Sequence, residues 1–204
     1  MKNTVPFLKK AWKFIWEDDS IWSWLLNIAL AFILIKFLIL PGLGFAFGTS
    51  HPIVAVVSGS MEHDSNFDDW WAEQEKVYKP FGITKGDFEK FPMKNGFNKG
   101  DIIILFGVKP DNLKKGDIIV FSAQNSRARP DPIIHRVVSI NGDPAIVQTK
   151  GDHNLGQIRS PELDETNIKW TQVIGRASFR IPLVGYVKIW FVDIISAIMG
   201  PFTR

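Results

Sequence analysis

Three polar residues lie at or within β-type runs of this chain, and their types could supply a serine nucleophile, its base and its acid. The run at residues 53–57 leads into Ser-Gly-Ser-Met at residues 58–61. Gly59 lets the backbone turn sharply there, so that Ser60 can project its hydroxyl from the strand end. A serine hydroxyl is a weak nucleophile unless a neighbouring base removes its proton. Because Ser-Gly-Ser is also a common turn, the motif predicts a nucleophile only together with a base.

The candidate base is His135, which lies in the β-type run at residues 133–140. An imidazole with an unperturbed pKa of about 6.5 is mostly neutral at pH 7, as a general base must be. The alternative is a histidine that only fills a core or edge position of its strand. Arg136 falls on the opposite face, because successive side chains of a strand alternate, and it has no evident catalytic task.

The candidate acid is Asp152, in the sequence Thr-Lys-Gly-Asp-His-Asn at residues 149–154. Its carboxylate would orient the imidazole of His135 and stabilise its protonated form. A turn is the alternative, since Lys-Gly-Asp also occurs at residues 85–87, 99–101 and 115–117. The two latter copies continue as Ile-Ile, so each reads as a turn that begins a strand.

Thiol, metal and nucleic-acid chemistry have no support in the composition. The chain has no cysteine, which excludes a thiol nucleophile, a disulfide and thiolate zinc ligands. It has four histidines but no His-Glu-x-x-His spacing, so we predict neither a catalytic zinc nor a cofactor. The net charge is only +3 and the lysines form no basic tract, which argues against a nucleic-acid partner.

An apolar stretch near the N-terminus is long enough to cross a lipid bilayer. Residues 21–40 are apolar except for Ser23, Asn27 and Lys36, and about 20 helical residues span the roughly 30 Å hydrocarbon core. A cleaved signal peptide is the alternative, but its apolar region would be only about 7–15 residues long. We therefore predict an uncleaved transmembrane anchor at residues 21–48.

Lysines ahead of this span predict its orientation. They lie in the basic, aromatic-rich segment 1–20, which the positive-inside rule places in the cytoplasm. The remaining chain is then expected on the outer face of the cell membrane.

The rest of the chain is rich in short β-type runs punctuated by Gly, Asp and Pro. The predicted fold is mainly β: an antiparallel β catalytic domain with an N-terminal transmembrane helix and a short C-terminal interfacial helix. The domain is expected at residues 49–185 and the interfacial helix at residues 186–204, with a second span as its alternative. The predicted strands are residues 53–57, 102–106, 118–121, 133–140, 145–148 and 173–181.

An insertion at residues 62–98 is polar and aromatic. One interpretation is a small core of its own that covers one side of the domain. The other is a surface that contacts the bilayer or a partner, because Trp favours membrane interfaces.

The order of these motifs resembles that of the type I signal peptidases of peptidase family S26. It runs from the span through Ser-Gly-Ser-Met, the paired Lys-Gly-Asp-Ile-Ile turns and His-Arg-Val-Val at residues 135–138 to Thr-Lys-Gly-Asp-His-Asn. Phe-Arg-Ile-Pro-Leu-Val-Gly at residues 179–185 looks like the closing strand of that family. Histidine at residue 135, where the bacterial branch has lysine, makes the chain similar to the archaeal and endoplasmic-reticulum-type branch.

This resemblance implies a membrane-bound serine endopeptidase that removes signal peptides from exported preproteins. By the same resemblance Ser60 is the nucleophile, His135 is the general base, and the Ser58 hydroxyl assists the Ser60 amide in an oxyanion hole. Family members usually carry a second acid about six or seven residues after the Gly-Asp, where this chain has Ile158 and Arg159. The candidate acids are therefore Asp152 or, on a longer loop, Asp164.

Two other functions stay open on the sequence alone. One is a non-catalytic membrane-anchored β module that presents clients to another enzyme, which the departure from the acid pattern and the aromatic insertion favour. The other is a peptidase of the same family with a narrow set of clients. No motif identifies accessory subunits.

Overall fold

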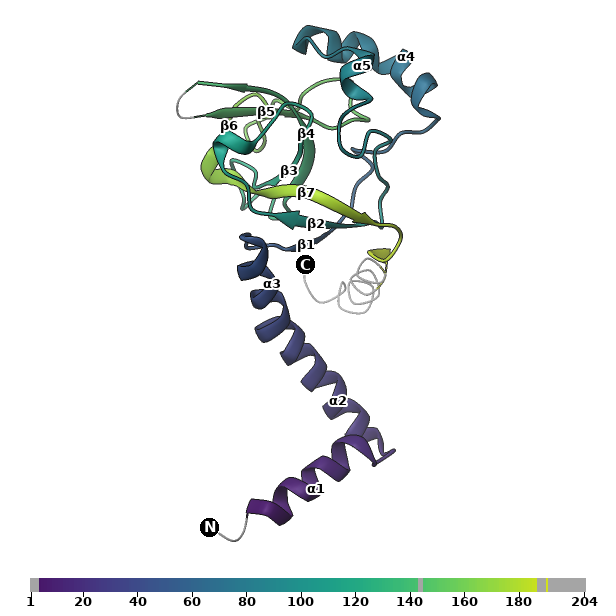
Figure 1. Ribbon diagram of the computed structural model, residues 1–204, viewed down its shortest axis with the longest axis vertical. Helices are drawn as coiled ribbons and strands as arrows, with labels where there is room; N and C mark the ends of the chain where they lie inside the picture. Colours follow the sequence, from purple (N-terminus) through teal and green to yellow (C-terminus); the bar gives the residue numbers. More distant parts are fainter. Residues whose placement is uncertain (1–3, 143–144, 187–189, 191–204) are drawn as a thin grey trace. The chain divides into compact units, whose positions relative to one another are not determined.

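A computed structural model describes residues 4–142, 145–186 and 190, and it divides into two units, Met1–Ala46 and Phe47–Arg204 (Figure 1). The expected C-terminal interfacial helix lies outside the described residues, apart from Tyr186 and Trp190.

The N-terminal unit is helical. An amphipathic helix α1 (Thr4–Trp16), which the sequence analysis did not predict, precedes the apolar stretch. That stretch forms α2 (Ile21–Leu34), the π-helical segment η1 (Ile35–Ile39) and α3 (Leu40–Phe47). Together they are one run of 27 residues, Ile21–Phe47, long and apolar enough to cross a membrane. This agrees with the predicted transmembrane helix.

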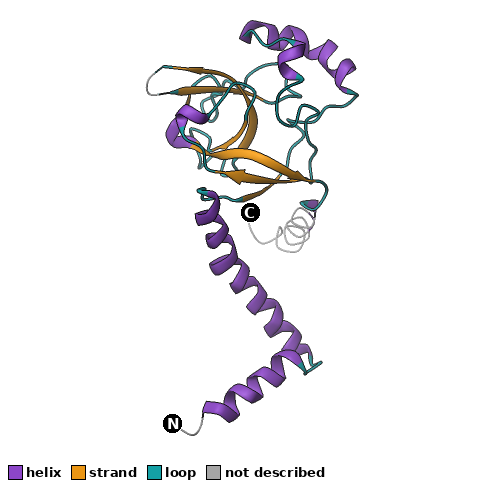
Figure 2. Cartoon of the chain, in the orientation of Figure 1, coloured by secondary structure: helices purple, strands orange, loops and turns teal. Residues whose placement is uncertain are grey.

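The second unit is built on an antiparallel sheet, as predicted. Figure 2 colours its strands orange and its helices purple. In the described residues seven strands take the order β1-β2-β7-β3-β4-β5-β6, and every neighbouring pair is antiparallel. Their bounds are β1 (Ile53–Ala55), β2 (Ile102–Phe106), β3 (Ile118–Phe121), β4 (Ile133–Asn141), β5 (Ile146–Lys150), β6 (Ile168–Lys169) and β7 (Val173–Ile181). The two-residue strand β6 was too short for its pattern to be recognised.

The repeated Lys-Gly-Asp turns begin strands β2 and β3. Gly100 and Gly116 have φ angles of 90° and 94°, which a side chain would strain. Asp101 and Asp117 each accept a hydrogen bond from the backbone N–H three residues earlier, at Asn98 and Lys114. Both turns were predicted from the repeat.

Apolar side chains of the sheet and its loops form two clusters in the second unit. The first contains residues from β2, β3, β4 and β7 together with Met61, and the second gathers residues around β3, β4 and β5 with Leu163 and Ile168. Short 3-10 turns, η3 (Pro110–Asn112) and η4 (Trp170–Gln172), precede β3 and β7.

The insertion forms a third cluster, which matches the interpretation as a small core. It folds as α4 (Phe67–Tyr78), η2 (Lys79–Phe81) and α5 (Lys85–Phe88). Its buried side chains pack on Val138 of β4: Trp70, Trp71, Tyr78, Ile83 and Phe88. The insertion is therefore attached to the strand that carries His135.

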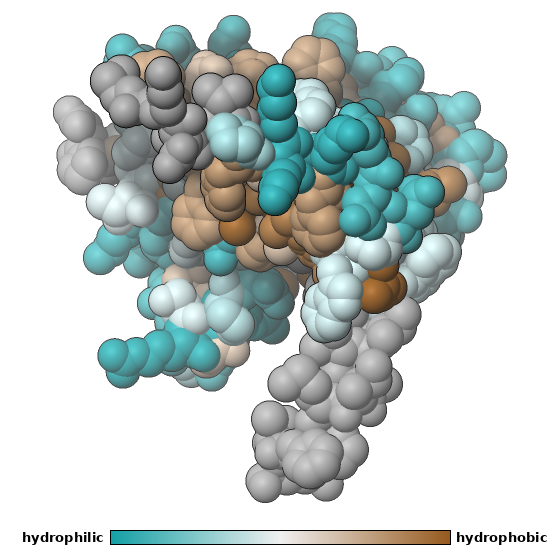
Figure 3. All heavy atoms as spheres, turned by 90° about the horizontal axis from the view of Figure 1, so that it is seen from below, coloured by the Kyte–Doolittle hydropathy of each residue, from teal (hydrophilic) through white to brown (hydrophobic). Residues whose placement is uncertain are grey.

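Figure 3 colours the surface by residue hydropathy and shows hydrophobic residues exposed on the side in view. Many large apolar side chains are exposed along the span, among them Phe32, Phe37 and Leu38. Exposed apolar side chains of this number on a single helix fit contact with lipid.

Candidate active site

Ser60 is held between the core and the turn that follows β5. Its neighbour Met61 is fully buried, and the Met61 carbonyl accepts a hydrogen bond from the Phe97 amide. The Ser60 carbonyl accepts a hydrogen bond of 3.0 Å from the His153 amide. The Ser60 hydroxyl lies 3.3 Å from the hydroxyl of Ser58. Backbone hydrogen bonds thus hold Ser60 and Met61 in place, and the side chain of Ser58 contacts that of Ser60.

Ser58, Ser60 and His135 line the same surface cleft. Its apolar walls come from the β1 strand and from the start of β4, at Val54, Ala55, Ile133 and Ile134. A cleft with an apolar wall and a few converging polar groups is the usual form of a substrate site. The structure therefore brings together the predicted nucleophile, base and oxyanion residue.

The absence of a side chain at Gly151 lets His135 approach the backbone of Ser60. A Cβ atom at Gly151 would lie 2.8 Å from His135 Nε2 and 2.7 Å from the Ser60 carbonyl oxygen. Since both atoms approach one point, the Nε2 side of the imidazole faces the Ser60 segment. A side chain at this position would separate them.

The other ring nitrogen of His135 meets a buried carboxylate that was not predicted. His135 Nδ1 is 2.5 Å from Glu165 Oε1, and the two side chains are 3% and 0% exposed. Glu165 also accepts hydrogen bonds from the Thr149 hydroxyl, at 2.9 Å, and the Ile158 amide, at 2.7 Å. These neutral donors hold the carboxylate in place beside the imidazole.

Glu165 reaches this position from the far side of a small hairpin. The Glu165 amide donates to the Ile158 carbonyl, and Arg159 and Asp164 form the next bridge. Glu165 therefore lies directly across from Ile158, where the family pattern usually has its acid. The hairpin delivers a carboxylate to the same place from the opposite strand.

Asp164 faces away from His135. Its carboxylate accepts hydrogen bonds from the amide and hydroxyl of Thr166, at 2.9 and 2.7 Å. Adjacent side chains on an extended segment point to opposite sides, so Asp164 and Glu165 cannot both face inward. Of the two, only Glu165 is fully buried.

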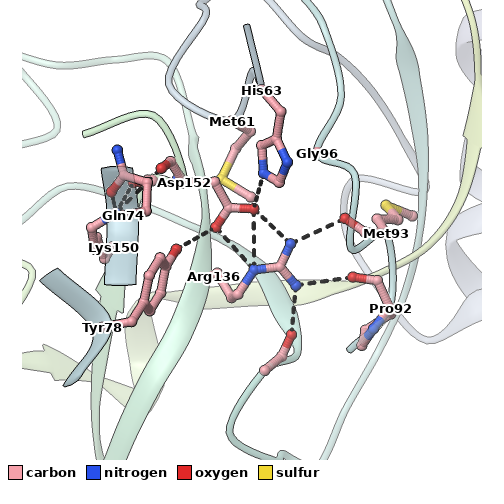
Figure 4. A network of polar contacts seen from close by, with 12 residues as sticks. Met61, His63, Gln74, Tyr78, Pro92, Met93, Gly96, Arg136, Lys150 and Asp152 are labelled. Atoms are coloured by element: carbon pink, nitrogen blue, oxygen red, sulfur yellow. Dashed lines mark hydrogen bonds and ion pairs between the residues drawn. The ribbon is translucent and has the colours of Figure 1, made fainter. Parts of the chain in front are cut away.

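Asp152 lies on the other face of β4, with Arg136 (Figure 4). Both side chains are fully buried, and Arg136 Nη2 donates to Asp152 Oδ2 at 2.6 Å. Tyr78 of α4 donates to Asp152 Oδ1 at 2.7 Å, and His63 Nε2 lies 3.2 Å from Oδ2. The structure places Asp152 in this network, whereas Glu165 occupies the position beside His135.

Asp152 also differs from the other Lys-Gly-Asp aspartates. Asp87, Asp101 and Asp117 each accept a hydrogen bond from the backbone amide three residues earlier. The Asp152 carboxylate instead binds side chains from β4 and from the insertion. The turn alternative therefore does not describe the role of its side chain.

The charges of Asp152 and Arg136 interact strongly on this face of β4. Burial alone would raise the pKa of the Asp152 carboxyl, but the adjoining Arg136 guanidinium and His63 together outweigh it and hold that pKa well below its usual range. Arg136 also donates to the carbonyls of Pro92, Met93 and Gly116. A buried charge with this many partners ties β4 to the insertion.

A second cation, Lys150, completes the network in Figure 4. Its ammonium donates to the Gln74 side chain at 3.1 Å and to the Gly151 carbonyl at 2.9 Å, and it lies 4.3 Å from the centre of the Tyr78 ring. Burial lowers the pKa of Lys150 to about 8 although Asp152 and Glu165 act in the opposite direction. Lys150 thus connects helix α4 to the turn behind the cleft.

A signal for Glu165 was present in the sequence. Leu163 is fully buried, and period-two alternation from this apolar residue places Glu165 inward and Asp164 outward. The short bridged segment around Asp164 was not predicted from the sequence, so this alternation was missed. The insertion residues that bind Asp152 carried no comparable signal.

Comparison with known proteins identifies the class. The family model described as "Signal peptidase, peptidase S26" matches residues 21–154, so the chain belongs to this family. It is 29% identical over 178 residues to the human signal peptidase complex catalytic subunit SEC11C, which covers 81% of this chain and 73% of the relative. It is 28% identical over 171 residues to SEC11 of Lachancea thermotolerans, with 80% of each chain covered. The predicted resemblance to endoplasmic-reticulum-type signal peptidases is confirmed.

Membership in this family makes the chain a signal peptidase, a serine hydrolase that removes signal peptides. With the apolar run Ile21–Phe47 at its N-terminus, it is a membrane-anchored protein.

Proposed function

We propose that Ser60, His135 and Glu165 form the catalytic triad of this signal peptidase. The observation that carries the proposal is the His135–Glu165 pair, with its Nε2 side turned toward the segment of Ser60. A carboxylate at Nδ1 fixes the tautomer in which Nε2 lacks a proton, and it stabilises the imidazolium that forms later.

The reaction follows from this arrangement. Ser60 Oγ attacks the scissile carbonyl carbon of the preprotein, and His135 Nε2 accepts the hydroxyl proton. His135 then gives this proton to the leaving amine as the peptide C–N bond breaks, which leaves an acyl ester on Ser60. Water attacks the ester carbonyl while His135 accepts a proton from it, and His135 passes this proton to Ser60 Oγ as the ester C–O bond breaks and the signal peptide departs with a new carboxyl terminus. Glu165 stays ionised throughout.

Ser58 has a separate task in this proposal. Its hydroxyl lies 3.3 Å from the Ser60 hydroxyl and lines the cleft. A donor placed there can stabilise the negative charge that develops on the carbonyl oxygen. We assign Ser58 and the Ser60 amide to the oxyanion hole, as the family resemblance implied.

The direct test is cleavage of a model preprotein by the purified protein in liposomes. Ser60→Ala should reduce the rate by about 10⁴-fold or more. Ser65→Ala is the matched control, because Ser65 is exposed and bonds only to the neighbouring Asn66 carbonyl in the described residues. Cleavage that survives Ser60→Ala would remove the triad assignment. Wild-type protein that binds preproteins without cleaving them would favour the client-presenting module.

Orientation and partners belong to the same proposal. The lysines before the span favour a cytoplasmic N-terminus and a catalytic unit on the outer face of the cell membrane. The SEC11 relatives are named as subunits of a signal peptidase complex, so we infer that accessory subunits bind this chain too. Protease protection of tagged termini in sealed cells tests the first inference, and copurification from its own membranes tests the second.

A further inference from the structure

Helix α1 separates its lysines from its apolar residues. At about 100° per residue, Lys9, Lys10 and Lys13 fall within an arc of about 100° of the helix surface. Apolar side chains occupy most of the remaining circumference. The four largest exposed ones are Phe7, Leu8, Trp12 and Trp16, which are 62–71% exposed. This pattern of a basic face and an aromatic-rich apolar face is typical of helices that lie in a membrane interface.

A polar connection holds α1 to the start of the span. The Ser23 hydroxyl donates to the Phe14 carbonyl at 2.6 Å, and the Asn27 side-chain amide donates to the Ile15 carbonyl at 2.9 Å. These carbonyls belong to the last turn of α1, where helix geometry leaves them without partners. Ser23 and Asn27, two polar residues of the otherwise apolar stretch, therefore cap α1.

The connection also prevents α1 from continuing along the axis of the span. Residues 17–20 are not helical, and Ser20 caps α2 by accepting a hydrogen bond from the Ser23 amide. The Ser20 amide donates to Asp18 at 2.7 Å, so the break is fixed from both sides. Since α2 enters the bilayer at this point, a helix that turns away from its axis lies near the membrane surface.

We propose that α1 binds the anionic lipid surface at the N-terminal end of the span, with its apolar face in the acyl boundary and its lysines among the headgroups. Charge complementarity and continuity with the span support lipid as the occupant of this face. Of the nearby acidic residues, Glu17 pairs with Lys13 at 3.8 Å, and Asp18 and Asp19 lie in the connection, so Lys9 and Lys10 carry most of the positive charge of this face. The Ser23–Asn27 cap holds the helix in reach of the surface.

Paired labels test the orientation of α1 in the full-length protein. The chain has no cysteine, so Leu8→Cys and Lys10→Cys each give one site for an environment-sensitive fluorophore on opposite faces. In phosphatidylcholine–phosphatidylglycerol liposomes, nitroxide lipids should quench the label at residue 8 and leave the label at residue 10 largely unquenched. Equal, water-like fluorescence at both positions would overturn the proposal.

Two further variants separate lipid charge from the hydrogen-bonded cap. Replacing Lys9, Lys10 and Lys13 with Gln in the Leu8→Cys protein should weaken docking by roughly fivefold per lysine on the anionic bilayer, with a much smaller effect on phosphatidylcholine alone. Ser23→Ala with Asn27→Ala should reduce quenching at residue 8, whereas Ser23→Thr should retain it.

Comparison of the two kinds of liposome distinguishes lipid from a protein as the binding partner of α1. Quenching at residue 8 that ignores both lipid charge and lysine replacement would show that lysine–headgroup contacts do not hold the helix, and the proposal would fail. Protection of residue 8 from water without lipid quenching would point to a protein partner or a second copy, and it would also overturn the proposal.

Discussion

The two faces of strand β4 carry two buried carboxylates in contrasting surroundings. On the face of His135, Glu165 receives neutral donors from Thr149 and Ile158 and meets an imidazole. On the face of Arg136, Asp152 meets a permanent cation in a network that is tied to the insertion. Adjacent residues on one strand thus point to a cleft on one side and to a packed interior on the other.

The contrast between the surroundings of Glu165 and Asp152 indicates which of them is suited to catalysis. A carboxylate that is neutralised by a permanent guanidinium has little charge left with which to stabilise a new cation. Glu165 lacks such a partner among the described residues, so its charge is available when His135 becomes protonated. We therefore expect substitutions of Glu165 to reduce turnover, and substitutions of Asp152 to reduce stability first.

Among substitutions that compare the two carboxylates and their partners, the largest effect is expected from Glu165→Gln. The amide preserves the shape but removes the charge and the acceptor pattern that fix the imidazole tautomer, so kcat should fall by about 10⁴-fold. The free energy of unfolding should fall by only about 1–2 kcal/mol. Preprotein cleavage and chemical denaturation in detergent measure the two quantities. An active Glu165→Gln enzyme would return the acid role to another residue.

Asp152→Asn should give the opposite pattern. It leaves the buried Arg136 charge uncompensated, which costs about 3–5 kcal/mol of unfolding free energy. The residual activity per folded molecule should exceed that of Glu165→Gln, because His135 keeps its carboxylate. Activity corrected for the folded fraction makes the comparison. Unchanged stability with abolished turnover would contradict the division between the two faces.

Lys150, which lies in the network around Arg136, should make the free energy of unfolding depend on pH. Its pKa of about 8 in the folded protein lies below the unfolded value of about 10.4. Between these values the unfolded chain holds a proton that the folded protein has released, so stability rises with pH, by at most about 1.4 kcal/mol per unit. This rise should disappear in Lys150→Met and persist in Lys76→Met, which changes an exposed lysine of α4. Denaturation curves at several pH values provide the measurement.

The smallest effect is expected from Tyr78→Phe. It removes one donor to Asp152, whose Oδ1 atom still accepts from Arg136 Nε at 2.9 Å. A hydrogen bond to a charged group is worth about 1.5–3 kcal/mol, and turnover should change little. A large loss of turnover without a loss of stability would instead connect the insertion directly to catalysis.

Most of the fold could be predicted because its signals are local. Five of the six predicted runs form strands that include all, or all but one, of the predicted residues. The first, at residues 53–57, ends early at Ala55. The paired Gly-Asp turns fixed two strand starts through φ angles that favour glycine. The early end of β1 reflects the turn toward Ser60, which is set by distant contacts.

The site was predicted only where motif and strand coincide. Ser58, Ser60 and His135 stand in or beside recognisable runs, and the structure gathers them at one cleft. Glu165 was not predicted as the acid, because pairing across a hairpin brings it to His135 and its spacing from Asp152 does not. The contacts of Asp152 with His63 and Tyr78 join residues 89 and 74 positions apart, and no local pattern encodes such separations.

The strand order also controls when the active site can assemble. The last strand, β7, lies in the middle of the sheet, where it pairs with β2 on one side and with β3 on the other, so it joins β1 and β2, which lead to Ser60, to the strands on the side of His135. A growing chain supplies its N-terminal residues first. Ser60, the proposed nucleophile, is therefore synthesised about 120 residues before the end of Val173–Ile181, the strand that joins its part of the sheet to that of His135. If the proposed triad holds, we expect a nascent copy to be inactive until its domain is nearly complete.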